Sequence, residues 1–423
     1  MHKLLIIGAL FLVSSVNGQI EEVRRITETL CSPEFHGRGY VNKGDSIAAE
    51  FLAAEFEGIG VKPYGKTYFQ PFTIDVNTFP GKMRIANNGR VLTAGKDFVI
   101  NPSSQGTDNI KLLAKEIPKD MAFDIPYIQA AIQEVISGET QENALLFDYT
   151  NVSKDTLKEL RGLAAEVARI VPVIELIDTK FTWSVGREQR YKLYIQIQDS
   201  VFERGAYTDV EIEAKLIPNY ETQNVIAYIP SKKKCAKTVV FTAHYDHLGR
   251  MGVDTYFPGA NDNASGTAML LTMANHFKKN PAAYNIMFIA FSGEEAGLVG
   301  SKHFVDNPFL KLDKIKFLIN LDIMGSGEEG ITVVNATLFE EQFNLLVEIN
   351  DENKLLEKVK KRGPAANSDH YWFTENGVPS FFIYTMGPNK HYHDVFDEYS
   401  ELSFNEYDDI TELLIEFVER LKK

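Results

Sequence analysis

The stretch "VVFTAHYDHLG" (239–249) decides the fold class, because an apolar run leads directly into a group of ionisable side chains. Its first five residues are apolar or small, which predicts a buried strand. His244, Asp246 and His247 follow at once. Burying such groups without partners costs several kcal/mol each. The strand is therefore expected to end at a place where other parts of the chain supply partners.

From about residue 221 onward, apolar strand-like runs alternate with helix-like segments. This alternation predicts an α/β fold with a mainly parallel central sheet and helices on both faces. The clearest helices are predicted over 264–279 and 405–423. The predicted strands are "NVIAYI" (224–229), "TVVFTAHY" (238–245), "NIMFIAF" (285–291), "KFLINLD" (316–322), "ITVVN" (331–335) and "PSFFIYT" (379–385).

The remaining chain divides into three parts. Residues 1–18 contain Lys3, an apolar run and a small-residue end, which is the pattern of a signal peptide cleaved before Gln19. Residues 19–64 form an N-terminal segment with a helix over 42–63. Residues 65–220 are rich in turns and short strands, interrupted by a helix-like stretch, and are interpreted as an inserted accessory domain. Residues 221–423 form the main domain.

The apolar run of the leader is too short to span a bilayer, and no later segment approaches about 20 apolar residues. We therefore expect export to the periplasm or the extracellular space, without a stable membrane anchor; an uncleaved anchor helix is the alternative. The formal charge of −14 argues against nucleic-acid or anionic-membrane partners. The only two cysteines, Cys31 and Cys235, exclude a disulfide scaffold and a cysteine zinc site, while their pairing stays open.

Several of the predicted strands end in acids or histidines. His244 closes one strand, Glu294 and Glu295 follow the next, and Asp322 closes a third. The sequence "HYHD" (391–394) comes soon after the last strand. Because ligands bind outside the carboxyl ends of the strands in an open α/β sheet, we expect these residues to converge on one site.

Histidines and carboxylates without thiolates are suitable ligands for Zn²⁺ in a hydrolytic site. Two ions about 3.5–4 Å apart need a shared carboxylate. Asp262, in the turn "PGANDNASG" (258–266), is the candidate bridge, and Glu294 remains as a candidate general base. The five candidate ligands are His244, Asp262, Glu295, Asp322 and His393.

Each of these motifs also has a purely structural interpretation. A histidine at a strand end is commonly hydrogen-bonded, an acidic pair commonly lies in a solvated loop, and "NDNASG" resembles a turn and helix cap. Their occurrence together, all at strand ends, favours a metal site.

At these residues the chain resembles metallopeptidase family twenty-eight, the co-catalytic zinc exopeptidases that include secreted bacterial leucine aminopeptidases. The resemblance extends over about 221–423, and the segment 30–63 resembles the leader region whose helix packs on the peptidase domain. Residues 65–220 resemble the protease-associated insertion of the family only in position and turn-rich character. The motifs that carry it are "AHYDHLG" (243–249), "PGANDNASGTA" (258–268), "FSGEEAGLVGS" (291–301), "NLDIMG" (320–325), "SDHYWF" (368–373) and "YHDVFDEY" (392–399).

The resemblance implies the zinc exopeptidase fold and two zinc ions. His244 and Asp322 would bind one ion and Glu295 and His393 the other, with Asp262 between them and a cis peptide after it. It implies hydrolysis of the N-terminal bond of a peptide with a free N-terminus, by water that the zinc ions activate and Glu294 deprotonates.

Three further roles follow from the same resemblance. Asp246, two residues from His244 and therefore on the same face of an alternating strand, would orient its imidazole, and Tyr392 would stabilise the oxyanion. His247 would point to the other side as a structural residue.

Some alternatives stay open. His391 is close enough to His393 to compete as the ligand. A carboxypeptidase or dipeptidase of the same family would bind a free carboxylate, for which Arg362 is a candidate. Glutaminyl cyclisation, which the relatives perform with one zinc ion, is disfavoured because all five ligands of a two-zinc site are present. A non-catalytic receptor-like protein is disfavoured because such a protein would lack a ligand or the base, and this sequence contains all of them. The substrate side-chain preference and the oligomeric state are not predicted.

Overall fold

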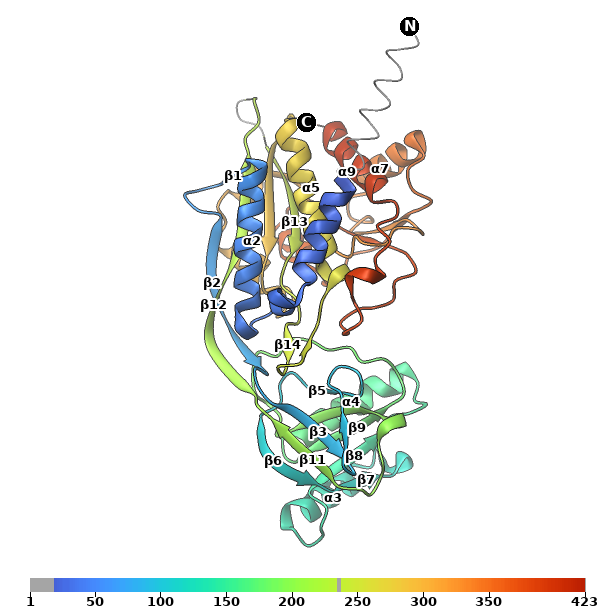
Figure 1. The fold of residues 1–423 in the computed structure, drawn as a ribbon. Helices are drawn as coiled ribbons and strands as arrows, with labels where there is room; N and C mark the ends of the chain where they lie inside the picture. The colour runs from blue at the N-terminus through green and yellow to red at the C-terminus, as the bar shows by residue number, and fades with distance from the viewer. Residues whose placement is uncertain (1–18, 234–236, 423) are drawn as a thin grey trace.

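The computed structural model describes residues 19–233 and 237–422, which form two bodies joined by two long strands (Figure 1). These are β2 (Phe69–Thr78) and β12 (Lys215–Ile229), which pair antiparallel along their length. The predicted signal peptide and Cys235 lie outside the described residues, so cleavage and disulfide pairing stay predictions. Within the described ranges, every helix is too short or too polar to cross a bilayer.

The larger body is built on a nine-stranded sheet, in the order β1-β12-β16-β13-β17-β20-β18-β19 with β2 paired to β12. Its four central strands run parallel, which confirms the predicted α/β class with a mainly parallel sheet. The six predicted strands all occur, within a few residues at each end except for β12, which starts nine residues earlier. The bounds are β1 (Lys62–Pro63), β13 (Thr238–His244), β16 (Asn285–Phe291), β17 (Ile315–Leu321), β18 (Ile331–Val334), β19 (Val359–Lys361) and β20 (Ser380–Thr385).

Helices cover both faces of this sheet. Successive strand residues point to opposite sides, and both sets of side chains are mostly apolar and buried in the central strands. On one face, Phe241 packs against Phe277, with ring centroids 5.9 Å apart. On the other face, Phe291 packs against Phe304 and Phe373. The first face carries α2 (Gly44–Ile59), α5 (Gly266–Lys279), α7 (Glu340–Asn353) and α9 (Tyr407–Arg420), and the second carries α6 (Val299–Asp306) and α8 (His370–Glu375).

The N-terminal segment belongs to this body. Residues 19–31 are helical, and α2 lies along the sheet with Leu52 and Phe56 fully buried. The Phe56 ring lies 6.1 Å from the ring of Phe288 in the sheet. The segment therefore contributes to the same hydrophobic core as the sheet.

The accessory body has its own hydrophobic core between two sheets and two helices. One sheet has the order β5-β10-β9-β8-β7 and is parallel except for β5, and the other is antiparallel with the order β4-β3-β11-β6. The helix predicted over 154–170 occurs, but the helix over 125–137 and the parallel strands were not predicted. The bounds are β3 (Met83–Asn87), β4 (Arg90–Leu92), β5 (Phe98–Ile100), β6 (Thr107–Leu112), β7 (Ala114–Ile117), α3 (Ile125–Ser137), β8 (Ala144–Asp148), α4 (Lys154–Ala168), β9 (Val173–Ile177), β10 (Tyr194–Gln198) and β11 (Thr208–Ile212).

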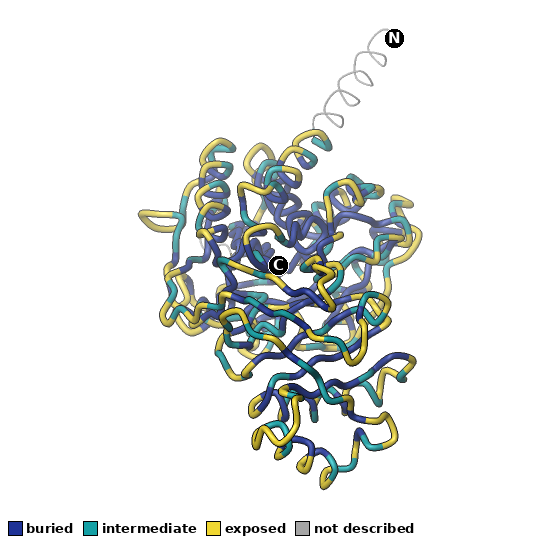
Figure 2. Tube along the Cα trace, turned by 60° about the horizontal axis from the view of Figure 1, so that its bottom comes forward, coloured by how far each residue is buried: buried dark blue, intermediate teal, exposed yellow. Residues whose placement is uncertain are grey.

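The accessory body packs against loops at the carboxyl ends of the central strands. Leu248, Phe257 and Val395, which come from the larger body, are buried within the accessory core. The indole of Trp183 stacks on Phe257, with centroids 4.7 Å apart. Near these loops lies the two-stranded hairpin of β14 (Arg250–Met251) and β15 (Thr255–Tyr256). Figure 2 shows that buried segments occupy the interior of both bodies, while exposed residues gather at loop tips.

Candidate metal centre

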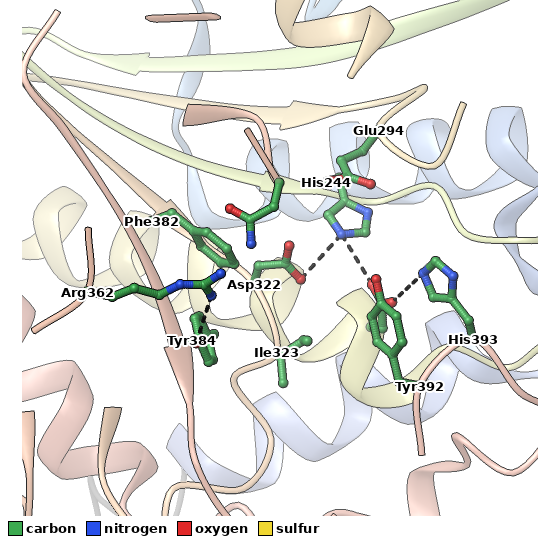
Figure 3. A pocket seen from close by; sticks show the side chains of 11 residues that line it. His244, Glu294, Asp322, Ile323, Arg362, Phe382, Tyr384, Tyr392 and His393 are labelled. Atoms are coloured by element: carbon green, nitrogen blue, oxygen red, sulfur yellow. Dashed lines mark hydrogen bonds and ion pairs between the residues drawn. The ribbon is translucent and has the colours of Figure 1, made fainter. Parts of the chain in front are cut away.

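The carboxyl ends of the central strands bring the five predicted ligands together. Figure 3 labels three of them, His244, Asp322 and His393. His244 is the last residue of β13, Asp322 directly follows β17, and Glu295 lies in the loop after β16. Asp262 lies in the turn before α5, and His393 lies in the loop after β20. His391, the competing histidine, instead lies 3.4 Å from Asp394.

The side chains of the five predicted ligands form two groups, called half-sites, that share Asp262. His244 Nε2 lies 3.3 Å from Asp262 Oδ1 and 3.4 Å from Asp322 Oδ1. His393 Nε2 lies 3.1 Å from Asp262 Oδ2 and 3.1 Å from Glu295 Oε2. Asp262 thus presents one carboxylate oxygen to each histidine, which is the arrangement that a bridging ligand requires.

The residues fit zinc on two grounds. Ligand atoms about 2.0–2.2 Å from a tetrahedral ion are about 3.3–3.6 Å apart, close to the spacings between these nitrogen and oxygen atoms. Asp262 Oδ2 and Asp322 Oδ1 are buried and accept no hydrogen bond from the described residues. Buried carboxylate oxygens need a hydrogen bond or a cation, so these atoms are suited to a metal ion.

Two distant segments hold the Asp262 turn. The Asp397 carboxylate accepts hydrogen bonds from the backbone N–H groups of Asn261 and Asp262, at 2.9 and 3.0 Å. Arg38, which is fully buried, donates to five backbone carbonyls, including that of Asp262 at 3.3 Å. The peptide bond between Asp262 and Asn263 is cis, as the family resemblance implied.

The exit of β17 is held in an uncommon conformation. Ile323, which follows Asp322, has φ of 58°, and this region is unfavourable for a β-branched residue. Its N–H donates to Asn263 Oδ1 at 3.1 Å, and its carbonyl accepts from the Thr385 hydroxyl at 2.6 Å. Backbone strain of this kind persists where surrounding contacts fix the chain, and here those contacts also fix the direction of Asp322.

Asp246 differs from its predicted role. The predicted contact was between its carboxylate and His244, but His244 Nδ1 lies 3.1 Å from the backbone oxygen of Asp246 and 3.9 Å from its carboxylate. The carboxylate instead accepts hydrogen bonds from the N–H groups of Glu294 and Glu295 and from the Tyr40 hydroxyl. Side chains alternate between the two faces only within a strand, and Asp246 lies outside β13, which ends at His244.

His247 also departs from the prediction that it points away. It is fully buried, and its Nδ1 lies 2.8 Å from Glu295 Oε1. Its ring centroid is 5.9 Å from that of His393. The end of β13 again explains the difference, since the chain has left the strand before residue 247. His247 therefore contacts Oε1 of Glu295, at the edge of the centre, while His393 contacts Oε2 of the same carboxylate.

A cavity of about 280 Å³ opens directly onto the centre. Of the acidic pair, Glu294 lines this cavity, whereas Glu295 faces His247 and His393. Tyr392 also lines the cavity and stacks on the His393 ring, with centroids 3.9 Å apart. The remaining lining residues are His244, Asp262, Asp322, Ile323, Arg362, Asn367, Phe382, Tyr384 and His393.

Proton affinities in this cluster are strongly perturbed. Burial, reinforced by the negative charges of Glu295 and Asp369, outweighs the attraction of His244 and raises the pKa of Glu294 well above its ordinary value. Burial opposes ionisation of Glu295, but the charge of His393, together with hydrogen bonds to His247 and His393, lowers its pKa to about 2. The pKa values of the adjacent residues Glu294 and Glu295 are thus shifted in opposite directions. This difference favours a proton-exchanging role for Glu294 and a ligand role for Glu295.

Sequence reasoning placed no functional residue in the accessory body, yet this body contacts the centre. The carbonyl of Trp183 lies 2.9 Å from His393 Nδ1, and its N–H donates to the His393 carbonyl at 2.9 Å. Lys180 Nζ lies 3.2 Å from the Asp394 carboxylate. These contacts are made by backbone atoms and by a single lysine, so no sequence motif predicts them. Arg38 was also missed, although a charged residue between two glycines in "HGRG" (36–39) is a detectable signal.

Comparison with known proteins relates these features to a family. The model of peptidase family M28 matches residues 224–418. Aminopeptidase YwaD of Bacillus subtilis is 34% identical over 180 residues, which cover 41% of this chain and only 37% of the relative. Leucine aminopeptidase 1 of Arthroderma gypseum is 27% identical over 257 residues, or 56% of this chain and 68% of the relative.

Two solved structures share the fold across nearly the whole chain. A zinc aminopeptidase from Bacillus subtilis has a TM-score of 0.68 at 20% identity, covering 95% of this chain and 96% of its own. A peptidase M28 precursor from Shewanella amazonensis has a TM-score of 0.65 at 15% identity, covering 94% and 96%. The motifs, the sheet and the family match agree over residues 224–418, the part of this chain that is similar to peptidase family M28.

Proposed function

We propose that the chain is a zinc-dependent aminopeptidase that removes the N-terminal residue of peptides. The observation that carries the proposal is the pair of half-sites around Asp262, with Glu294 facing the same cavity. The related proteins named as aminopeptidases support the reaction class. The predicted signal peptide supports export to the periplasm or the extracellular space.

In this proposal two Zn²⁺ ions are bound by the five clustered side chains. His244 and Asp322 would hold one ion and Glu295 and His393 the other, with Asp262 shared between the two half-sites. Bound zinc supplies Lewis acidity, which polarises a carbonyl and lowers the pKa of a coordinated water toward about 7. The ligands are themselves held by residues around them, as metal-binding histidines generally are.

The protein side chains then move the protons. Glu294 accepts a proton from the attacking water and delivers one to the leaving amine, a role suited to a carboxyl whose pKa is raised by burial. The Tyr392 hydroxyl, at the cavity wall, donates a hydrogen bond to the oxygen that gains negative charge. The acidic lining of the cavity attracts the substrate α-amino group. Because water is the nucleophile, no Ser or Cys is needed.

The test combines metal content with substrate chemistry. Purified protein is expected to contain about two zinc ions per chain. It is expected to cleave peptides with a free N-terminus, to lose this activity on chelation and regain it with zinc, and to leave N-acetylated peptides intact. Cleavage that ignores N-acetylation would replace the proposal with a carboxypeptidase. Protein that binds zinc but cleaves no peptide, or binds no zinc, would contradict the proposal in favour of a binding protein.

A further inference from the structure

One cation lines the cavity beside the acidic metal centre. Arg362 directly follows β19, and it faces the same cavity as Asp322 and Glu294 (Figure 3). Its Nη1 donates a hydrogen bond to the Tyr384 hydroxyl at 3.0 Å. Its guanidinium makes no ion pair with a carboxylate of residues 19–233 or 237–422, so most of its donors remain available.

The neighbouring lysine, Lys361, differs from Arg362 in this respect. Lys361 lies 3.1 Å from Glu340 and over the ring of Phe343, so its charge is already neutralised outside the cavity. Arg362, by contrast, is held in position by contacts with groups that carry no charge. Its backbone N–H donates to the Val333 carbonyl at 3.0 Å, and its guanidinium carbon lies 5.9 Å from the Tyr384 ring centroid. The side chain is therefore directed by contacts that leave its charge free.

The surrounding wall suits an acid with an apolar stem. Phe382 and Tyr384 provide aromatic surface, and Asn367 adds an amide close to the same cavity. A volume of about 280 Å³ is slightly below the range of typical ligand cavities, which are about 300–1,000 Å³. The cavity thus accepts a short piece of substrate, and a guanidinium is the side chain best matched to a carboxylate.

We propose that Arg362 binds a carboxylate of the substrate, so that the enzyme prefers peptides with an acidic group next to the scissile bond. The inference rests on the proposed aminopeptidase function and names its substrate class. The carboxylate has two possible sources: the side chain of an N-terminal Glu or Asp, or the free C-terminus of a dipeptide. Arg362 is a specificity-determining residue, because it touches the substrate away from the bond that is broken.

The experiment compares matched substrates on the zinc-loaded enzyme. Glu and Gln p-nitroanilides differ only in a side-chain carboxylate, and Leu-Gly and Leu-Gly-amide differ only in a terminal carboxylate. In the wild type, kcat/KM is expected to be higher for the acid of at least one pair. In Arg362→Met, that kcat/KM is expected to fall by about 10- to 100-fold, mainly through KM, while the neutral partner changes by less than about threefold. Lys361→Met is the matched control and should behave as the wild type.

The outcomes separate the two proposals. Preference for Glu over Gln assigns the side chain, and preference for the dipeptide acid over its amide assigns the C-terminus. Chelator-sensitive cleavage of Leu p-nitroanilide with no preference for either acid, or equal losses for acids and neutral substrates in Arg362→Met, would overturn the inference and leave the aminopeptidase standing. If no substrate is cleaved, calorimetric binding still tests Arg362 with two matched pairs, glutamic acid α-amide against glutamine α-amide and Leu-Gly against Leu-Gly-amide. Equal affinities within both pairs, or no change in Arg362→Met, would also overturn the inference.

Discussion

Replacing Lys180 with alanine tests whether the accessory body helps to build the metal centre. Lys180 Nζ donates to the carbonyls of Lys390 and Tyr392, at 2.9 and 3.3 Å, and lies 3.2 Å from the Asp394 carboxylate. These residues flank His393, whose backbone φ of 54° is in the left-handed region. The substitution should therefore loosen the loop that presents His393 while leaving every ligand in place.

The expected magnitude follows from the exposure of the two partners. A hydrogen bond from a charged donor contributes about 1.5–3 kcal/mol, and an exposed ion pair about 0–1 kcal/mol. The Lys180 side chain is 51% exposed and that of Asp394 only 4%, so we expect a loss between these ranges, about 1–2 kcal/mol. If this loss is transferred to the position of His393, zinc affinity at that half-site falls about 5- to 30-fold.

The assay is a zinc titration against a chromophoric chelator, which resolves the two binding events. Lys82→Ala is the control, because Lys82 forms a 2.6 Å ion pair with Glu211 inside the accessory body and does not contact the His393 loop. One ion should weaken in Lys180→Ala and neither in Lys82→Ala. Unchanged binding of both ions would refute the reasoning. Equal weakening of both, with a lowered melting temperature, would also refute it, since the effect would then be general destabilisation.

Three further predictions concern the centre and its supports. Glu294→Gln should keep both zinc ions but lower kcat by about 10²–10⁴-fold, whereas Asp262→Asn should lower zinc content as well; a Glu294→Gln enzyme with near-normal kcat would exclude this residue as the base. Burial raises the pKa of Asp45 to about 6, so the folded state binds its proton more tightly than the unfolded state and loses stability as the pH rises from about 4 through 6. Asp45→Asn should remove this loss and gain up to about 3 kcal/mol over the wild type between pH 4 and 7 in urea unfolding, and a gain independent of pH would disprove the argument. Arg38→Met should cost about 3–5 kcal/mol of unfolding free energy, because it leaves several buried carbonyls without donors; a loss below about 1 kcal/mol would show that these carbonyls find other partners.

Most of the proposed ligand positions could be predicted from the sequence because they follow strands with an obvious apolar pattern, whereas Asp262 lies in the turn before α5. His244 and Asp322 follow runs that no surface element would contain. Parallel strands place their carboxyl ends together, so the convergence of these residues needed only the strand assignment. The central sheet was predictable for the same reason.

The orientation of the neighbours could not be predicted in this way. The alternation of strand side chains suggested directions for Asp246 and His247, but β13 ends at His244 and the rule ends with it. Beyond that point the backbone path is set by contacts with other segments. One of these is Arg38, whose Nε donates to the Tyr245 carbonyl at 2.8 Å.

The parallel strands of the accessory body were missed because short apolar runs do not distinguish a strand from part of a helix. The run "ALLFD" (144–148) is a fully paired strand, and "YIQAAIQEVIS" (127–137), with a similar apolar content, is helical. Whether such a run forms a strand depends on the other strands with which it can pair. Ala144 pairs with Ala114, and Leu145 pairs with Val173, and nothing in the local sequence specifies these partners.

In the proposed centre Asp262 is the shared ligand, and both the N-terminal segment and the last loop of the chain hold it in place. Arg38 reaches the carbonyl of Asp262 from 224 residues earlier, and Asp397 accepts its N–H from 135 residues later. A carboxylate that serves two half-sites must be fixed more tightly than one that serves a single ion, because any rotation improves one contact at the expense of the other. Holding the peptide groups on both sides of Asp262 limits that rotation. The turn "PGANDNASG" therefore supplies the bridging side chain, while residues distant in the sequence supply its direction.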